Sequence, residues 1–142
     1  MRDRAAGPET AADRERLIAA LERDLRARPE IALALLHGSF LGGGAYGDID
    51  VAIWLDPARI RREDRDDYAL DLAVALHLAL GKPVDVRALN EASLAFRYHA
   101  LKGRPLMVHD EELLADLRAR TWDEYFDFQP FARAYLREVL RG

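Results

Sequence analysis

The sequence predicts a mixed α/β domain in which a small sheet is flanked by helices. Two apolar runs, Ile31–Leu36 and Ile49–Leu55, have the length of buried strands. Longer segments in which apolar residues recur every three or four positions lie around them, and these are typical of amphipathic helices. The resulting order of elements, α-β-β-α-β-α-β-α with short strands and longer helices, is that of a sheet packed against helices.

The first four elements follow from apolar spacing and from the residues that end each run. Thr10 and Asp13 have the spacing of a capping box, and apolar residues at helical intervals come after them. An apolar run ended by a Gly-Ser turn predicts a strand buried on both faces. A second run closed by an Asp-Pro pair predicts another strand, and an apolar stripe closed by a C-cap glycine predicts the next helix. These elements are expected at 10–29, 31–36, 49–55 and 62–80.

The second half of the chain predicts two further strands and two further helices. In the first of these strands two valines alternate with Asp85 and Arg87, so one face of the strand is polar. We expect Asn90 to cap the short helix that follows. The last helix opens with acidic residues, as its dipole favours, and Pro130 should kink or divide it. These elements are expected at 83–89, 90–103, 106–108 and from 110 onward.

Composition excludes several classes of protein. With 142 residues, the chain has room for one domain, which we expect at 10–142 after a flexible N-terminal arm at 1–9. A net charge of −4 argues against direct binding of nucleic acid through a general basic field. The absence of cysteine excludes disulfides, thiolate catalysis and zinc–cysteine sites. We see no signal peptide and no apolar run of the roughly 20 residues that span a membrane, so we expect a cytoplasmic protein with no membrane contact.

The stretch between the first two strands is the most informative about function. Gly38-Ser39 ends one strand, a glycine-rich loop follows, and Asp48-Ile49-Asp50 opens the next strand. Two aspartates two positions apart on a strand leave from the same face, with Cα atoms about 7 Å apart. Their carboxylates repel each other unless a cation lies between them. A turn that cradles phosphate beside a clamp for a divalent metal is typical of nucleotidyl transfer.

A third carboxylate is expected on a neighbouring strand, and Asp85 is the natural candidate. It is the only acid inside an apolar strand pattern elsewhere in the chain, and it could also accept the proton of an attacking hydroxyl. Each part has an ordinary structural interpretation when taken alone: a Gly-Ser turn can be only a turn, and Asp85 could pair with Arg87. Because the turn, the Asp-x-Asp and the third acid occur together, the functional interpretation is favoured.

These residues resemble the minimal nucleotidyltransferases (MNT) of the DNA polymerase beta superfamily, in particular the antitoxins of HEPN/MNT toxin–antitoxin pairs. The core of the resemblance is Gly38-Ser39, Asp48-Ile49-Asp50 and Asp85. Softer likeness lies in 102–106 and in the aromatic segment 125–130. The fold that the resemblance implies is a polymerase-beta-like palm, a short mixed sheet flanked by helices, with further helices at the C-terminus.

The resemblance also implies an activity, a set of site residues and a partner. Gly38 and Ser39 would bind the triphosphate of ATP, and Asp48, Asp50 and Asp85 would be catalytic and hold magnesium. Antitoxins of this kind can transfer AMP from ATP to a tyrosine hydroxyl of the HEPN toxin, which blocks its RNase activity. The expected partner is therefore a HEPN-domain toxin, bound in a hetero-oligomer, and the aromatic C-terminal segment also suits a homo-oligomer.

Two alternatives to this function stay open, and departures from the family pattern favour the first of them. Eight residues separate Ser39 from Asp48, a shorter loop than the commonest family pattern, and none of them is basic, whereas many relatives have an arginine there. More distant cations such as Lys82 or Arg87 would then have to neutralise the charge of a triphosphate. One alternative is thus an antitoxin with little or no catalytic activity that neutralises its toxin by binding. The other is a small-molecule transferase of the aminoglycoside type, which usually carries an additional domain.

Overall fold

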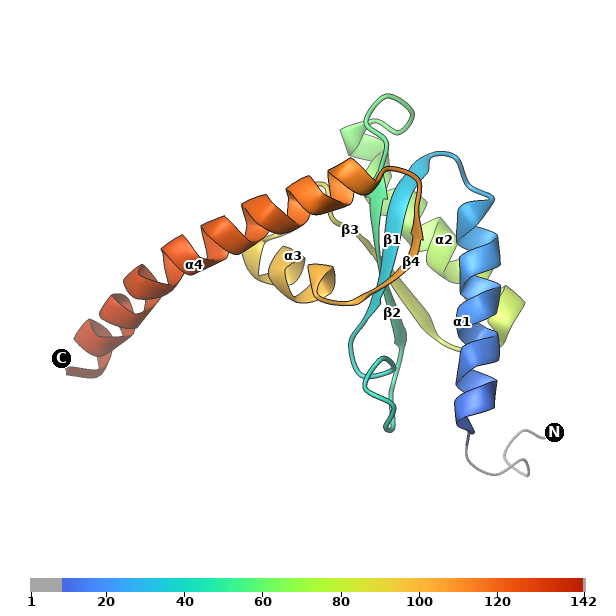
Figure 1. Cartoon of the computed structure of the whole chain (residues 1–142), viewed down its shortest axis with the longest axis horizontal. Helices are drawn as coiled ribbons and strands as arrows, with labels where there is room; N and C mark the ends of the chain where they lie inside the picture. The colour runs from blue at the N-terminus through green and yellow to red at the C-terminus, as the bar shows by residue number, and fades with distance from the viewer. Residues whose placement is uncertain (1–8, 142) are drawn as a thin grey trace.

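The computed structural model of the chain describes residues 9–141 and is shown in Figure 1. It has the predicted order of helices and strands, with a short 3-10 helix before the second α-helix. The elements in chain order are α1 (Ala11–Arg26), β1 (Ile31–His37), β2 (Ile49–Leu55), η2 (Arg62–Asp64), α2 (Arg65–Leu80), β3 (Val84–Ala88), α3 (Leu94–Leu101), β4 (Arg104–Val108) and α4 (Glu111–Arg141).

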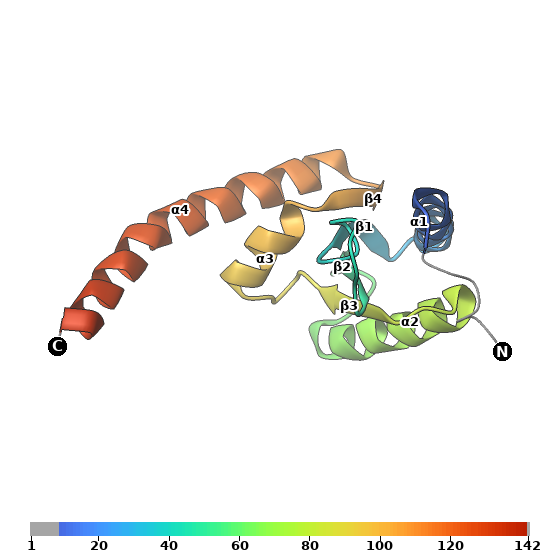
Figure 2. The same cartoon turned by 90° about the horizontal axis from the view of Figure 1, so that it is seen from below.

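The four strands form one mixed sheet in the order β3-β2-β1-β4. β1 is antiparallel to both β2 and β4, whereas β2 and β3 are parallel and are joined by the α2 crossover. Figure 2 shows α2 and α1 on one side of the sheet and α3 with the start of α4 on the other. The mixed sheet flanked by helices confirms the predicted fold class.

The sheet separates two hydrophobic clusters. One lies under α1 and α2 and includes Leu21 and Leu76, and the other lies under α3 and α4 and includes Leu101 and Leu114. β1 contributes to both clusters: its residues Ile31, Leu33, Leu35 and Leu36 are all fully buried. The prediction of a first strand buried on both faces is therefore confirmed, and this strand is the centre of the core.

Two of the predicted helix caps are confirmed, whereas a third is wrong. The capping box at α1 is present, because Thr10 Oγ1 accepts from the Asp13 N–H at 3.1 Å and Asp13 accepts from the Thr10 N–H at 2.9 Å. Gly81 ends α2 in the left-handed region. The prediction that Asn90 caps α3 is wrong, because Ser93 occupies that position. The Asn90 side chain instead bonds both backbone groups of Leu55, at 3.0 and 2.9 Å, and so fastens the end of β3 to the end of β2.

The C-terminal helix is less interrupted than expected. Of the two outcomes expected at Pro130, division does not occur: α4 continues past the proline to Arg141 and bows gently (Figure 2). Its first half packs against α3, and its second half extends away from the sheet (Figure 1). No helix within residues 9–141 combines the length and the apolar character needed to cross a bilayer.

The expected N-terminal arm falls mostly outside the described residues. Residues 1–8 are not described, and neither is the final Gly142. The last residue of the arm, Glu9, is described, and its carboxylate lies 3.2 Å from Lys82 Nζ. The extent of the arm and of the single domain at 10–142 therefore stay predictions.

Candidate active site

Two carboxylates stand at one register position on β2 and β3. Asp50 is the direct partner of Asp85 in the parallel ladder, and His37 of β1 is the partner of Asp50 on its other side. Because directly opposite residues share a face of the sheet, the three side chains form a row across three strands. The row lies on the face that α3 covers, where the Phe96 ring is 5.4 Å from the His37 ring. The strand pairing thus brings together two of the three predicted acids.

The third predicted acid, Asp48, lies at the end of the loop, outside this row. It is exposed and directly precedes β2. The pKa of Asp50 is raised, mainly because burial disfavours its charged form and also because Asp85 and Asp48 are negative, although His37 and Arg87 oppose the shift. The pKa of His37 is lowered, again chiefly by burial. The centre of the row therefore carries a carboxylate that a bound cation would stabilise.

The Gly-Ser turn lies directly against this carboxylate. Gly38 has φ of +80°, and a Cβ on it would lie 2.1 Å from Asp50 Oδ2. Only glycine therefore fits between the turn and the acid. The loop then coils through successive turns, with the Leu41 N–H bonded to the Gly38 carbonyl at 3.2 Å and the Gly42 N–H bonded to the Ser39 carbonyl at 3.1 Å. Ser39 is exposed at the beginning of these turns.

The three carboxylates suit magnesium, although their side chains do not converge on a common point. Among residues 9–141, no three His, Cys, Asp or Glu side chains converge as a ready metal site. Asp85 accepts a hydrogen bond from Arg87 Nε at 3.3 Å, which is the pairing that the structural interpretation expected. These two side chains are 41% and 63% exposed, so the pair is weak and easily exchanged. Three carboxylates, one with a raised pKa, are the hard oxygen ligands that Mg²⁺ prefers.

An arginine reaches the glycine-rich loop from α1, although the loop itself contains none. Arg14 donates hydrogen bonds to the carbonyl oxygens of Phe40, at 3.0 Å, and of Gly44, at 2.5 Å. Its guanidinium carbon also lies 5.0 Å and 4.9 Å from the ring centroids of Phe40 and Tyr46. The sequence did not predict this contact of Arg14, because a single arginine in the first turn of a helix belongs to no recognisable motif.

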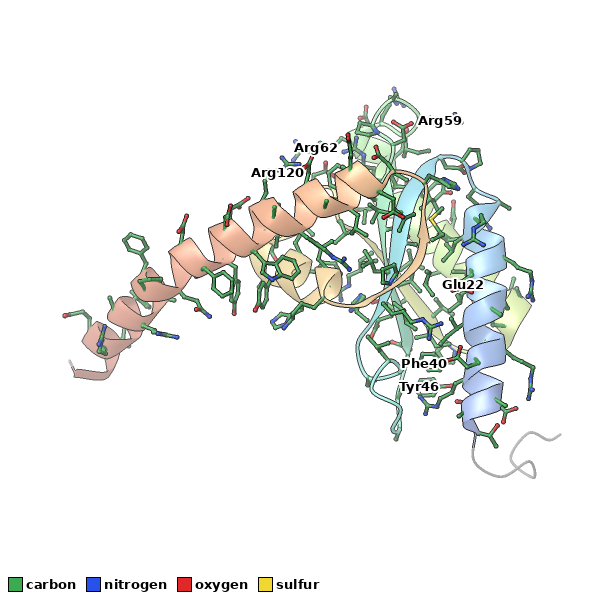
Figure 3. The ribbon with its side chains drawn as sticks, in the orientation of Figure 1. Glu22, Phe40, Tyr46, Arg59, Arg62 and Arg120 are labelled. Carbon is green, nitrogen blue, oxygen red and sulfur yellow. The ribbon has the colours of Figure 1, made fainter. Side chains whose placement is uncertain are left out.

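Tyr46, within the loop, is a second residue whose role becomes visible only in the structure. Its ring packs edge-to-face on Phe40 at 4.7 Å, and Figure 3 shows the two side chains close together beside α1. Its hydroxyl donates to the Glu9 carboxylate at 2.8 Å, and burial together with Glu9 raises the pKa of Tyr46 to about 12. Because Glu9 also pairs with Lys82, that cation takes part in holding the loop.

A family model described as Polymerase beta, Nucleotidyltransferase matches residues 19–112 of this chain. The matched span holds all four strands, the Gly-Ser turn and the three acids. The chain belongs to the polymerase beta nucleotidyltransferase family. The family assignment thus confirms the resemblance that the motif indicated and agrees with the observed mixed sheet.

Solved structures of toxin–antitoxin complexes contain chains with the fold of this nucleotidyltransferase. A chain in the complex of a tri-AMPylated Shewanella oneidensis HEPN toxin with an MNT antitoxin is 23% identical, with a TM-score of 0.67 over 89% of this chain and 98% of that one. A chain in a toxin–antitoxin structure with AMP-PNP is 25% identical, with a TM-score of 0.66 over the same shares. A chain in a mutant MntA–HpeT toxin–antitoxin is 26% identical, with a TM-score of 0.68 over 89% and 97%. No curated protein is detectably similar in sequence.

Proposed function

We propose that this nucleotidyltransferase is an antitoxin that transfers AMP from ATP to a tyrosine hydroxyl of a HEPN toxin, in a reaction that requires magnesium. The observation that carries the proposal is the register of Asp50 with Asp85, with Gly38 packed against the Asp50 carboxylate. The likeness to chains in structures of a tri-AMPylated HEPN toxin and of a complex with AMP-PNP supports the choice of substrate and acceptor. A cytoplasmic location belongs to the same proposal.

The acids of the site have distinct tasks in such a transfer. Asp48, Asp50 and Asp85 would hold magnesium, which when bound neutralises charge on the phosphates and lowers the pKa of the attacking hydroxyl. The turn at Gly38 and Ser39 would hold the triphosphate beside the acids. Asp85 would accept the proton of the tyrosine hydroxyl, whose oxygen forms the bond to the α-phosphorus. The bond from that phosphorus to the β-phosphate oxygen breaks, and pyrophosphate leaves.

A second candidate function is neutralisation of the toxin by contact alone. The observation that favours it is the pairing of the nearby cations: Arg87 bonds Asp85, Lys82 pairs with Glu9, and Arg14 is bonded to the loop. In this arrangement each of these three cations already has a partner, which it would have to exchange for the triphosphate. A protein of this kind would bind its toxin tightly without modifying it.

Intact-mass measurement separates the two functions. The purified chain is incubated with ATP, Mg²⁺ and the HEPN protein, and the mass of the HEPN protein is then determined. A gain of one or more AMP units that is lost in Asp48→Ala/Asp50→Ala and after chelation by EDTA is the expected result. Asp116→Ala, which removes an exposed carboxylate on α4, is the matched control and should retain transfer. A stable complex without a gain in mass would contradict transfer and support neutralisation by contact.

A further inference from the structure

The outer edge of β3 is open. β3 stands at the end of the sheet and, within residues 9–141, pairs only with β2. The Pro83 carbonyl accepts from the Ile49 N–H at 2.9 Å, and the Leu89 N–H donates to the Ile53 carbonyl at 2.7 Å. The backbone groups of the odd-numbered residues along β3 therefore bond to β2. In a parallel ladder the alternate residues, here 84, 86 and 88, direct their backbone groups to the other side. An edge of this kind can accept a further strand.

A groove follows this open edge and is lined by two acids of the candidate site, Asp48 and Asp85. It consists of two adjoining hollows that share Leu70 and Ala73 of α2, with volumes of about 410 and 330 Å³. The first is lined by Asp85 and extends to Ser93 at the start of α3, and the second is lined by Asp48. An occupant of the groove would therefore lie alongside β3 with the acids of the site within its reach.

One wall of the groove belongs to an exposed apolar stripe on α2. Leu70, Val74 and Leu78 are 64%, 52% and 77% exposed, and they lie four residues apart on one side of the helix. Leu70 and Val74 line the groove, whereas Leu78 does not. A surface with such large exposed apolar side chains beside an unpaired strand is typical of a binding site rather than of an ordinary solvated face.

We propose that this groove docks the acceptor: an extended segment of the partner protein that pairs with β3 as a fifth strand and carries the tyrosine to be modified. The proposal rests on the proposed function, because the acids at the groove make its occupant the group that reacts. Side chains alternate along a strand, so one set would pack on Leu70 and Val74 and the other set would face Asp85. The tyrosine would stand in the second set, with apolar residues directly before and after it.

The charge of the groove limits the acceptor further. Asp48, Asp66 and Asp85 line it, against the single positive charge of Arg87, while its fourth acid, Glu91, is already paired with Arg65. The unpaired negative charge favours an acceptor segment whose flanks are basic. The specificity expected is therefore a tyrosine between two apolar residues, with lysine or arginine farther out on either side.

Two acceptors and two substitutions test the groove. The probes are N-acetyltyrosinamide, which has no flanking residues, and the blocked peptide Lys-Lys-Val-Tyr-Val-Lys-Lys. We expect kcat/KM for AMP transfer to the peptide to exceed that for the small acceptor by about tenfold or more. Leu70→Ser should remove this gain and weaken peptide binding about tenfold, because it removes an apolar side chain from the wall without adding a charge. Leu78→Ser is the matched control, since it alters a more exposed residue of the same stripe outside the groove and should retain both properties.

Binding measured without ATP keeps this proposal separate from the proposed function. Fluorescence anisotropy gives the peptide affinity, and hydrogen exchange should show protection of the amides at 84, 86 and 88 when peptide is bound. Peptide binding that depends on Leu70, without any AMP transfer, would contradict the proposed function and leave the docking groove supported. Equal affinity and equal transfer in Leu70→Ser and Leu78→Ser would overturn the groove while transfer stands. A dimer that only Leu70→Ser dissociates in sedimentation, with no effect of peptide, would assign the edge to a second copy of the chain and also overturn it.

Discussion

Gly38 and Asp50 are packed so closely that no side chain fits between them. A Cβ on Gly38 would lie 2.1 Å from Asp50 Oδ2, and the backbone at Gly38 has φ of +80°, in the left-handed region that favours glycine. The turn that begins the loop and the central carboxylate of the row are therefore one structural unit. Displacing either should disturb the other.

Gly38→Ala should abolish transfer because the new methyl group must push the Asp50 carboxylate away. A displacement of about 1 Å in a positioned group costs roughly 100-fold in rate, and we expect at least that loss in AMP transfer. Gly43→Ala is the matched control, since Gly43 also has positive φ, at +87°, but a Cβ there meets nothing within 4 Å. Both variants should lose about 1 kcal/mol of unfolding free energy from backbone strain, measured by urea denaturation. Equal loss of transfer in both would show that strain in the loop, not displacement of Asp50, is responsible.

Asp85→Asn should remove activity while leaving the fold intact. A general base contributes roughly 100- to 10,000-fold, so the kcat for AMP transfer should fall by that order. The unfolding free energy should change by less than about 1 kcal/mol, because the pair of Asp85 with Arg87 is largely exposed. Arg87→Ala breaks the same pair and retains the carboxylate. If it lowered kcat as much as Asp85→Asn does, Asp85 would act only through its pairing.

Arg14→Met should loosen the loop and weaken nucleotide binding. The substitution removes two hydrogen bonds to loop carbonyls from a side chain that is only 16% exposed, so we expect a loss of about 1–3 kcal/mol in unfolding free energy and a higher KM for ATP. Arg16→Met is the control two residues away on the same helix: its side chain is 71% exposed and bonds only Asp13 among the described residues. That variant should change stability by less than about 0.5 kcal/mol. An unchanged KM in Arg14→Met would mean that the loop keeps its shape without the arginine.

The features that the sequence predicted correctly are those that short segments determine. Apolar runs and caps such as Thr10 and Gly81 act within a few residues, and the pairing of Asp50 with Asp85 follows from a parallel β-α-β unit. The roles of Arg14 and Tyr46 were not predicted, because their partners lie far along the chain and no residue pattern indicates these contacts. Asn90 was misassigned for a related reason, since its side chain can cap a helix or bond another strand, and tertiary contact with Leu55 decided between the two.

Two tyrosines should make stability depend on pH in the alkaline range. Burial and the carboxylates of Glu9 and Glu30 raise the pKa of Tyr46 and of Tyr68 from 10.0 to about 12. The folded state therefore holds these two protons more tightly than the unfolded state does. The resulting stabilisation is complete below pH 10 and is lost as the pH rises from 10 to 12.

Denaturant unfolding at several pH values checks this prediction. The unfolding free energy of the wild-type chain should fall between pH 10 and 12, and Tyr46→Phe and Tyr68→Phe should each reduce the fall, with the double variant losing both contributions. A spectrophotometric titration of the folded protein provides the independent measurement: of the five tyrosines, the late-ionising component should shrink in each variant. A wild-type titration in which all tyrosines ionise together near pH 10 would contradict the contacts of both hydroxyl groups. If only Tyr68→Phe altered the late component, Glu9 would not hold Tyr46 in solution, and the anchoring of the loop through this tyrosine would be wrong.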